Sequence, residues 1–249
     1  MALIKVGDIS ELSVTARPRA SATVKNPSSI KTFGVLANTA PQAPAEAFDF
    51  AVSTQSRGLA LERLLLQKNF QGGLGRLLDR RRKVYFLAWA WDFSGKPVYF
   101  YPGGTSPAGT TLIPIKAQQE REFLGAGVLL SPPRPITGGL AIRLHLWVSN
   151  SDSRRFGETM VKVSETIKQS EVNTLLAVIA TVGGLTTASV SAAWAASLEL
   201  SSVIGKILEA RNDSHIDLYE GFFPAKQRWS PKSQAWKANA SEITLARLR

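Results

Sequence analysis

The chain has 249 residues, no cysteine, and 30 Lys plus Arg residues against 19 Asp plus Glu residues, which gives a net charge of +11. The absence of cysteine excludes disulfide frameworks, thiolate nucleophiles and Cys-ligated zinc or iron–sulfur sites. The surplus of positive charge favours acidic partners such as anionic lipid or nucleic acid.

The beginning of the chain, "MALIKVGDISELSV", has no basic region followed by a long apolar run. We therefore expect no secretory signal peptide, synthesis in the cytoplasm, and release or membrane association on activation. Residues 1–57 are rich in Ala, Ser, Thr and Pro and predict a β-rich, partly irregular segment that packs on the core. Residues 58–249 carry that core, and we expect one domain overall.

The stretch from 58 to 70, "GLALERLLLQKNF", has the apolar spacing of a short amphipathic helix. In such a helix Leu61, Leu64, Leu65 and Phe70 lie near one side, and the two glycines that follow end it.

Strand-like alternation follows in "KVYFLAWAW", where both faces are apolar, and this predicts a central strand. "PVYFYPGG" comes after a turn and predicts its hairpin partner. "REFLGAGVLLSPP" and "GGLAIRLHLWVS" predict two more strands. In the last of these Arg143 and His145 share one face, so we expect that face to contact water. Four strands at this spacing, separated by Gly and Pro turns, predict a β-sandwich.

Helical spacing begins near residue 158 and continues to about 211, as in the series Met160, Val163 and Ile167. Between Glu171 and Glu199 lie 27 residues without a charge, with Gly183-Gly184 near the middle. The pattern predicts two helices of about 25 residues each, joined at the glycines. The expected fold class is therefore α+β, an antiparallel β-sandwich with an inserted long α-helical hairpin.

The segment "LHLWVSNSDSRRFGE", residues 144–158, resembles the strand, Asp-bearing loop and Phe-Gly-Glu turn near the calcium-binding edge of C2 domains. "AWAWDFSGKP", with Asp92 after an apolar strand, resembles a second such loop. The resemblance implies an antiparallel β-sandwich of a kind that often docks on lipid. Calcium takes about six to eight oxygen ligands, whereas this loop offers Asp152 beside Arg154 and Arg155, so we expect no calcium site.

No catalytic site, metal site or cofactor site is indicated by the residues. The two histidines, His145 and His215, have no nucleophile or metal-ligand partner at a recognisable spacing. "QGGLGR" lacks the Lys-Ser/Thr of a phosphate-binding loop. We therefore expect a protein that is not an enzyme, with His145 an exposed or hydrogen-bonded strand residue.

The uncharged hairpin suggests a membrane-active effector whose hairpin inserts into lipid after oligomerisation, a candidate pore-forming protein of bacterial toxin type. The expected insertion residues are Leu176, Val178, Ile179, Val182, Gly183, Gly184, Leu185, Val190 and Trp194. Basic residues, some beside tryptophans, suit the headgroups of anionic lipid or phosphate. The expected contact residues are Arg80, Arg81, Arg82, Lys83, Lys226, Arg228, Trp229, Lys232, Trp236 and Lys237.

Two other functions fit the same features. A structural or interaction module would use the hairpin for homo-oligomerisation or assembly with a partner. A nucleic-acid-binding protein would use the basic run before the central strand, or the aromatic and basic residues near the end of the chain, where rings suit stacking on bases.

Overall fold

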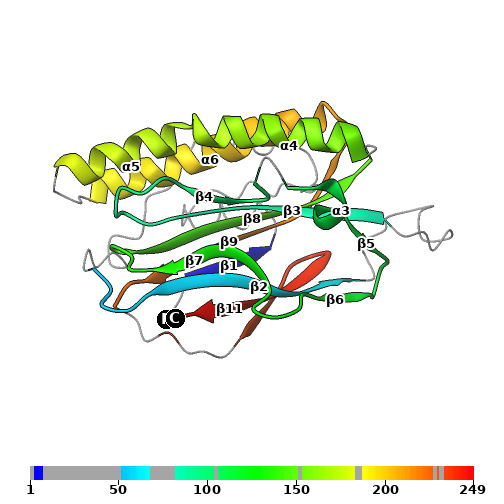
Figure 1. Cartoon of the computed structure of the whole chain (residues 1–249), viewed down its shortest axis with the longest axis horizontal. Coiled ribbons are helices and arrows are strands. Elements are labelled where there is room, and N and C mark those ends of the chain that lie inside the picture. The colour runs from blue at the N-terminus through cyan, green and yellow to red at the C-terminus, as the bar shows by residue number, and fades with distance from the viewer. Residues whose placement is uncertain are drawn as a thin grey trace, which may run out of the picture.

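A computed structural model describes residues 3–7, 52–67, 82–103, 106–150, 153–182, 187–226, 229 and 233–249. These residues form three layers: a layer of helices, a six-stranded sheet and a five-stranded sheet (Figure 1). All strand pairs in both sheets are antiparallel. The expected α+β class with a sandwich of two sheets is confirmed.

The six-stranded sheet follows the order β1-β9-β8-β3-β4, with β5 also pairing with β3. Its strands are β1 (Leu3–Gly7), β3 (Arg82–Trp91), β4 (Tyr99–Tyr101), β5 (Ile113–Ile115), β8 (Gly139–Ser149) and β9 (Ser214–Pro224). The short helix α3 (Ala108–Thr111) precedes β5. As expected, β3 is central and β4 is its hairpin partner.

The five-stranded sheet follows the order β10-β11-β2-β6, with β7 also pairing with β2. Its strands are β2 (Arg57–Leu66), β6 (Glu120–Glu122), β7 (Val128–Arg134), β10 (Gln234–Lys237) and β11 (Ser241–Leu248). The expected single strand at 121–133 is thus two strands, because Gly125 and Gly127 take positive φ angles in a turn between them. Both halves pair with β2.

The helix expected at 58–70 is wrong, since residues 57–66 form β2. Leu59, Leu61, Leu64 and Leu66 all point into the core between the two sheets. Their spacing of two, three and two residues follows from a register shift, because Leu245 pairs with Leu61 while Thr244 pairs with Arg63. The extra residue, Glu62, is typical of a β-bulge and breaks the strict alternation of a strand.

The helical layer covers the outer face of the six-stranded sheet and consists of α4 (Ser153–Lys168), α5 (Glu171–Val182) and α6 (Thr187–Glu209). The expected first arm is therefore two helices that meet at Gln169 and Ser170. Asn173 compensates for this break, because its Nδ2 donates to the carbonyls of Ile167 and Lys168 at 2.8 and 3.1 Å. The hairpin of two long helices is borne out only as this layer of three helices.

Two cores result. One lies between the helices and the six-stranded sheet and the other between the two sheets. The small residues Ala193 and Ser197 of α6 are fully buried, and Ser197 contacts the six-stranded sheet. Their size lets α6 approach the sheet closely, so that the indole Nε1 of Trp89 donates to Ser197 Oγ over 3.0 Å. Of the segment expected at residues 1–57, the structure describes residues 3–7, which form β1, and residues 52–57; the others lie outside the described residues.

Candidate functional site

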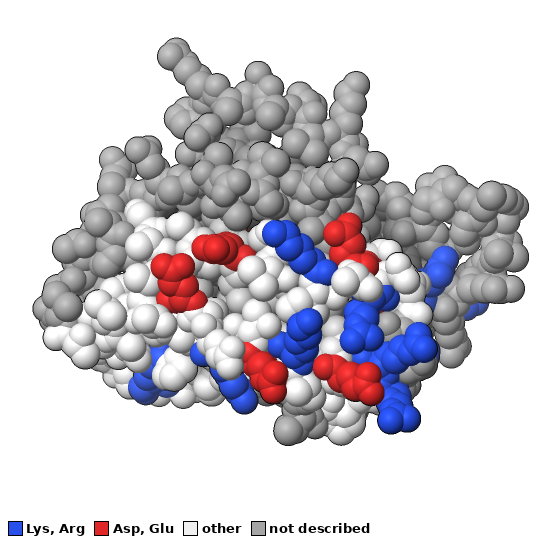
Figure 2. Space-filling view, turned by 90° about the horizontal axis from the view of Figure 1, so that it is seen from above, with Lys and Arg blue, Asp and Glu red and all other residues white. Residues whose placement is uncertain are grey.

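The solvent-exposed surfaces of α4 and α5, which follow each other in the helical layer, differ in charge. The exposed positions of α4 carry charges on Arg154, Arg155, Glu158, Lys162, Glu165 and Lys168. The exposed positions of α5 after Glu171 carry none, and they are Thr174, Ala177, Val178, Ala180 and Thr181. From above, charged side chains crowd the right part of the layer, while the left end, where α5 lies in Figure 1, is mostly uncharged (Figure 2).

The expected insertion residues divide between this surface and the core. Val178 is 50 % exposed at the centre of the uncharged α5 surface. Leu176, Ile179 and Val190 are buried against the six-stranded sheet, so they are core residues in this structure and their side chains are not exposed to lipid. Trp194 is partly buried, with its ring edge-on to Trp91 at 5.4 Å between centroids. Gly183, Gly184, Leu185 and the side chain of Val182 lie outside the described residues.

The loop between β3 and β4 holds α5 in place. The backbone N–H of Val98 donates to Asn173 Oδ1 over 2.8 Å. Gly95 lies so close to α5 that an added Cβ would stand 2.2 Å from the Cβ of Ala180. Gly95 also has a φ of +81°, a conformation that favours glycine.

Replacing Gly95 by alanine is therefore expected to displace α5 as well as strain the turn. The positive φ alone costs about 1–2 kcal/mol, and the contact with Ala180 adds to that. Gly125→Ala is the matched control, because Gly125 has a φ of +68° but no atom within 4 Å of an added Cβ. Urea unfolding measures the two losses, and hydrogen exchange of α5 amides should rise only in Gly95→Ala. Equal behaviour of the two variants would contradict this role for Gly95.

The expected lipid or phosphate contacts are spread over several surfaces. Arg82 and Lys83 are exposed at the start of β3, and Lys226 and Lys237 are exposed near the end of the chain. Trp236 is partly buried. Arg80, Arg81, Arg228 and Lys232 lie outside the described residues.

Trp229 is buried, in contrast to the expectation of a lipid-facing ring. Its indole packs at a tilt against the ring of Phe223, with 5.6 Å between the ring centroids, and the guanidinium of Arg57 lies 5.1 Å from its ring centroid. Packing of the aromatic ring against the sandwich core thus outweighs any exposure to solvent. Among the residues of this set that the structure describes, this tryptophan is therefore not part of an exposed aromatic and basic surface.

A buried polar cluster lies on the helix-facing side of the six-stranded sheet, where the sequence indicated contact with water. Arg143 on β8 is fully buried, and its Nη2 donates to Glu220 Oε1 on β9 over 2.7 Å. Its Nη1 lies 3.4 Å from Ser201 Oγ on α6, and its guanidinium lies 5.7 Å from the ring centroid of Trp194. Burial lowers the pKa of Arg143, while the charge of Glu220 raises it.

His145 and His215 extend this cluster, and both are buried. The phenol of Tyr85 donates to Asp213 Oδ2 over 2.7 Å at its edge. Burial raises the pKa of Asp213, and its hydrogen bonds with Tyr85 and Asn150 lower it. The cluster could not be identified from the sequence, because the residues that pair in it come from strands about 70 residues apart in the chain.

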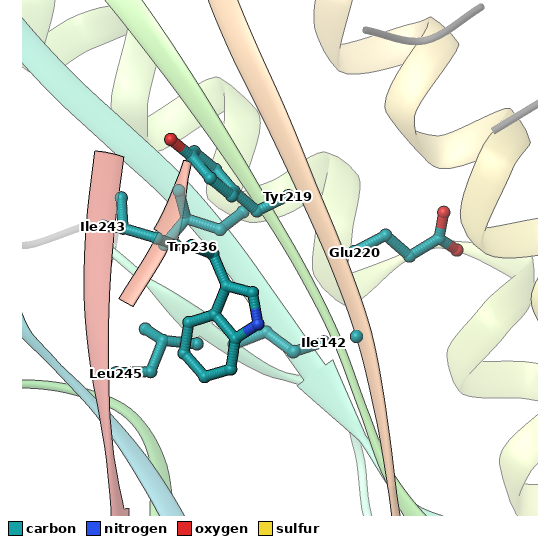
Figure 3. A pocket seen from close by; sticks show the side chains of 8 residues that line it. Ile142, Tyr219, Glu220, Trp236, Ile243 and Leu245 are labelled. Carbon is teal, nitrogen blue, oxygen red and sulfur yellow. The ribbon is translucent and has the colours of Figure 1, made fainter. Parts of the chain in front are cut away.

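A cavity lies on the opposite face of the six-stranded sheet from this cluster, between the two sheets. It measures about 10 Å³ and is lined mainly by apolar side chains, with Tyr219, Trp236 and Ile243 turned toward it (Figure 3). The carboxylate of Glu220 points away from this cavity toward the helices (Figure 3). A space of this size holds a water molecule at most, so it offers no room for a substrate beside Glu220.

Asp92, in the second loop of the C2 resemblance, is a buried structural carboxylate. It accepts hydrogen bonds from Arg134 Nη2 and from the backbone N–H of Thr137, both at 3.0 Å. In the first loop, residues 153–158 form the first turns of α4. Among the described residues, no three His, Cys, Asp or Glu side chains lie close enough together to hold a metal ion.

No protein-family model matches the chain, and no curated protein matches its sequence. Within the described ranges, no helix combines the length and the apolar composition that crossing a membrane requires.

Proposed function

We propose that the protein is a non-enzymatic, membrane-active effector that binds anionic lipid with its helical layer and inserts α5 into the lipid surface. The observation that carries the proposal is the exposed side of α5, which has no charge after Glu171, whereas the exposed positions of α4, in the same layer, are all charged except Val161. Helices that lie in a membrane interface bury their apolar side at the boundary of headgroups and acyl chains, and Ala177, Val178 and Ala180 are the apolar part of this uncharged side.

The charge of the chain supports anionic lipid as the partner. A net charge of +11 attracts negatively charged surfaces over a distance of about 10 Å at moderate salt. Lys96 is exposed in the loop that packs on α5, and Lys168 is exposed at the end of α4. Both cations flank the uncharged surface, where they can reach lipid phosphates while Val178 enters the apolar region.

Pore formation is a further step of this proposal. It requires that several copies assemble and that α5 and α6 together leave the six-stranded sheet, because Leu176 and Val190 are core residues while the layer is closed. Leakage of a dye from vesicles measures this step, and flotation with vesicles measures binding alone.

Val178→Asp is expected to weaken binding to anionic vesicles about tenfold or more. Burying a valine side chain is worth about 1.5–3 kcal/mol, and 1.4 kcal/mol is a factor of ten. Val161→Asp is the matched control, because Val161 on charged α4 is 45 % exposed against 50 % for Val178. Both changes replace an exposed helical valine, so both should leave the stability within about 0.5 kcal/mol. Equal binding by the wild type and both variants would remove α5 from the function.

The interaction-module alternative uses the same α5 surface to join copies of the chain. Sedimentation in the absence of lipid separates it from the membrane proposal. A dimer or larger assembly that Val178→Asp dissociates, without binding of the wild type to vesicles, would favour the module.

The nucleic-acid alternative rests on Arg82 and Lys83, which are exposed at the start of β3. Salt-dependent binding to DNA that is lost on replacing both residues would favour this alternative.

A further inference from the structure

Two histidines lie side by side on the sheet face that the helices cover. His145 Nδ1 on β8 and His215 Nε2 on β9 are 3.4 Å apart. The His145 ring stacks on Trp89 at 4.9 Å, and the His215 ring packs edge-on against Trp147 at 4.8 Å. Trp89 donates in turn to Ser197 of α6. The pair is therefore part of the contact between the six-stranded sheet and the helical layer.

The surroundings of the pair disfavour a charged imidazole. Burial, the neighbouring His215 and the cation of Arg143 hold the pKa of His145 well below its usual value. Burial lowers the pKa of His215 to about 3. The nearby carboxylate of Glu220 is already paired with Arg143.

No described helix supplies a compensating negative charge. From α6 the hydroxyls of Ser197 and Ser201 face the cluster, and the charged residues of α6, which are exposed, are Glu199, Lys206 and Glu209. The charged residues of α4 that the structure describes are exposed, as is Glu171 at the start of α5. Among the described residues of the strands, Lys83 is on this face but exposed at the start of β3. The buried ionisable groups beside Arg143 and Glu220 are Tyr85 and, just before β9, Asp213, and these two bind each other.

We propose that the His145–His215 pair makes the helical layer releasable by acid: proton uptake by the pair favours a state in which α5 and α6 have lifted from the six-stranded sheet while the two sheets stay together. The proposal deepens the membrane function and rests on it only for what the released helices then bind.

The direction follows from the lowered pKa values. The two neutral histidines stabilise the contact between sheet and helices in full above the histidine pKa of the unfolded chain, about 6.5. This stabilisation is lost as the pH falls toward their lower pKa values in the folded protein. In this window each histidine shifts the equilibrium toward the released state by up to about tenfold per pH unit. Asp213 acts in the opposite sense, because burial raises its pKa and release would free its proton. Its opposition begins only as the pH falls through that raised value.

The contact between the two sheets responds to acid with the opposite sign. Asp217 on β9 accepts a hydrogen bond from Ser241 on β11, and Ser241 also contacts the phenol of Tyr219. Burial raises the pKa of Asp217 to about 6. The sandwich therefore gains stability as the pH falls from about 6 toward about 3.8, the range in which the histidine pair weakens the helical contact.

Hydrogen exchange of the full chain without lipid, at about pH 7.5 and about pH 5 and corrected for intrinsic rates, tests the device. In the wild type, amides of α5 and α6 should lose protection by about tenfold or more at the lower pH, and amides of β2 and β11 should not. His145→Gln/His215→Gln removes both histidines of the chain and should abolish this difference. Helix protection that is independent of pH, or that falls equally in the double variant, would overturn the proposal.

The wild type alone still decides the matter if the double variant does not fold. Loss of protection in strands and helices together would mean global unfolding and would overturn the proposal. If the helices lose protection at about pH 5 but the protein does not bind anionic vesicles, acid release by the histidine pair is supported and the membrane function is contradicted. If vesicle binding is equal at both pH values and the helices keep their protection, acid release by the histidine pair is contradicted and the membrane function is supported.

Discussion

Replacing Glu220 by glutamine lowers the free energy of unfolding by about 3–5 kcal/mol, because Arg143 is left buried without a counter-charge. Arg143 is fully buried and lies 2.7 Å from the Glu220 carboxylate. Its remaining contacts, with the hydroxyl of Ser201 and the ring of Trp194, do not neutralise its charge. Urea unfolding at neutral pH measures the loss.

The double variant Arg143→Met/Glu220→Leu should recover most of this stability, since two well-packed apolar side chains remove both desolvated charges together. Glu120→Gln is the matched control. Glu120 pairs with Arg63 over 3.5 Å, but both side chains are about half exposed, so its loss should stay below about 1 kcal/mol. Similar losses for Glu120→Gln and Glu220→Gln would show that burial does not decide the energy of the Arg143 pair.

The strands of the six-stranded sheet were predictable where alternation is regular. Residues 84–91 are an unbroken apolar run, as in a strand that is buried on both faces, and residues 139–149 alternate; both lie in strands of ten or more residues. The bulge at Glu62 explains the failure at β2. One additional residue changes the spacing of the buried leucines so that it matches a helix as well as a strand, and pairing with β11, far along the chain, decides between them.

The wet face expected for β8 is wrong for a different reason. Arg143 and His145 suggest contact with water only as long as their partners are unknown. Glu220 and His215 lie about 70 residues later in the chain, across the whole helical segment. A pattern read within one strand cannot supply such partners, so the buried polar cluster could not be predicted from the sequence.

The helical layer was predictable in its extent but not in its division. Its apolar spacing runs through the break at Gln169 and Ser170, where no glycine or proline marks an end. The break depends instead on side chains that take over the free carbonyls, with Ser170 and Asn173 both donating to Ile167. The uncharged character of α5 was visible in the sequence, whereas only the structure separates exposed Val178 from buried Ile179.

Trp89→Ala is expected to cost about 3–5 kcal/mol, since it removes a large and fully buried ring from the centre of the six-stranded sheet. The change also removes the platform on which His145 stacks and the hydrogen bond to Ser197 of α6. We therefore expect the helical layer to loosen first, with α6 amides exchanging faster than those of β2. Urea unfolding together with hydrogen exchange measures both effects.

Two further variants separate the contributions of the Trp89 side chain. Trp89→Phe keeps most of the ring and loses the donor to Ser197, so its cost should be about 1–3 kcal/mol. Trp236→Ala removes the same side chain from the edge strand β10, where the indole is already partly in contact with water, and should cost less than Trp89→Ala. If Trp236→Ala were as damaging as Trp89→Ala, or if Trp89→Ala left α6 protected, the central position of Trp89 between sheet and helices would not be what stabilises the layer. If only the Trp89 variants lose much of their free energy of unfolding, the helical layer is stabilised mainly by its contact with β3. Release of α5 and α6 has to break this contact.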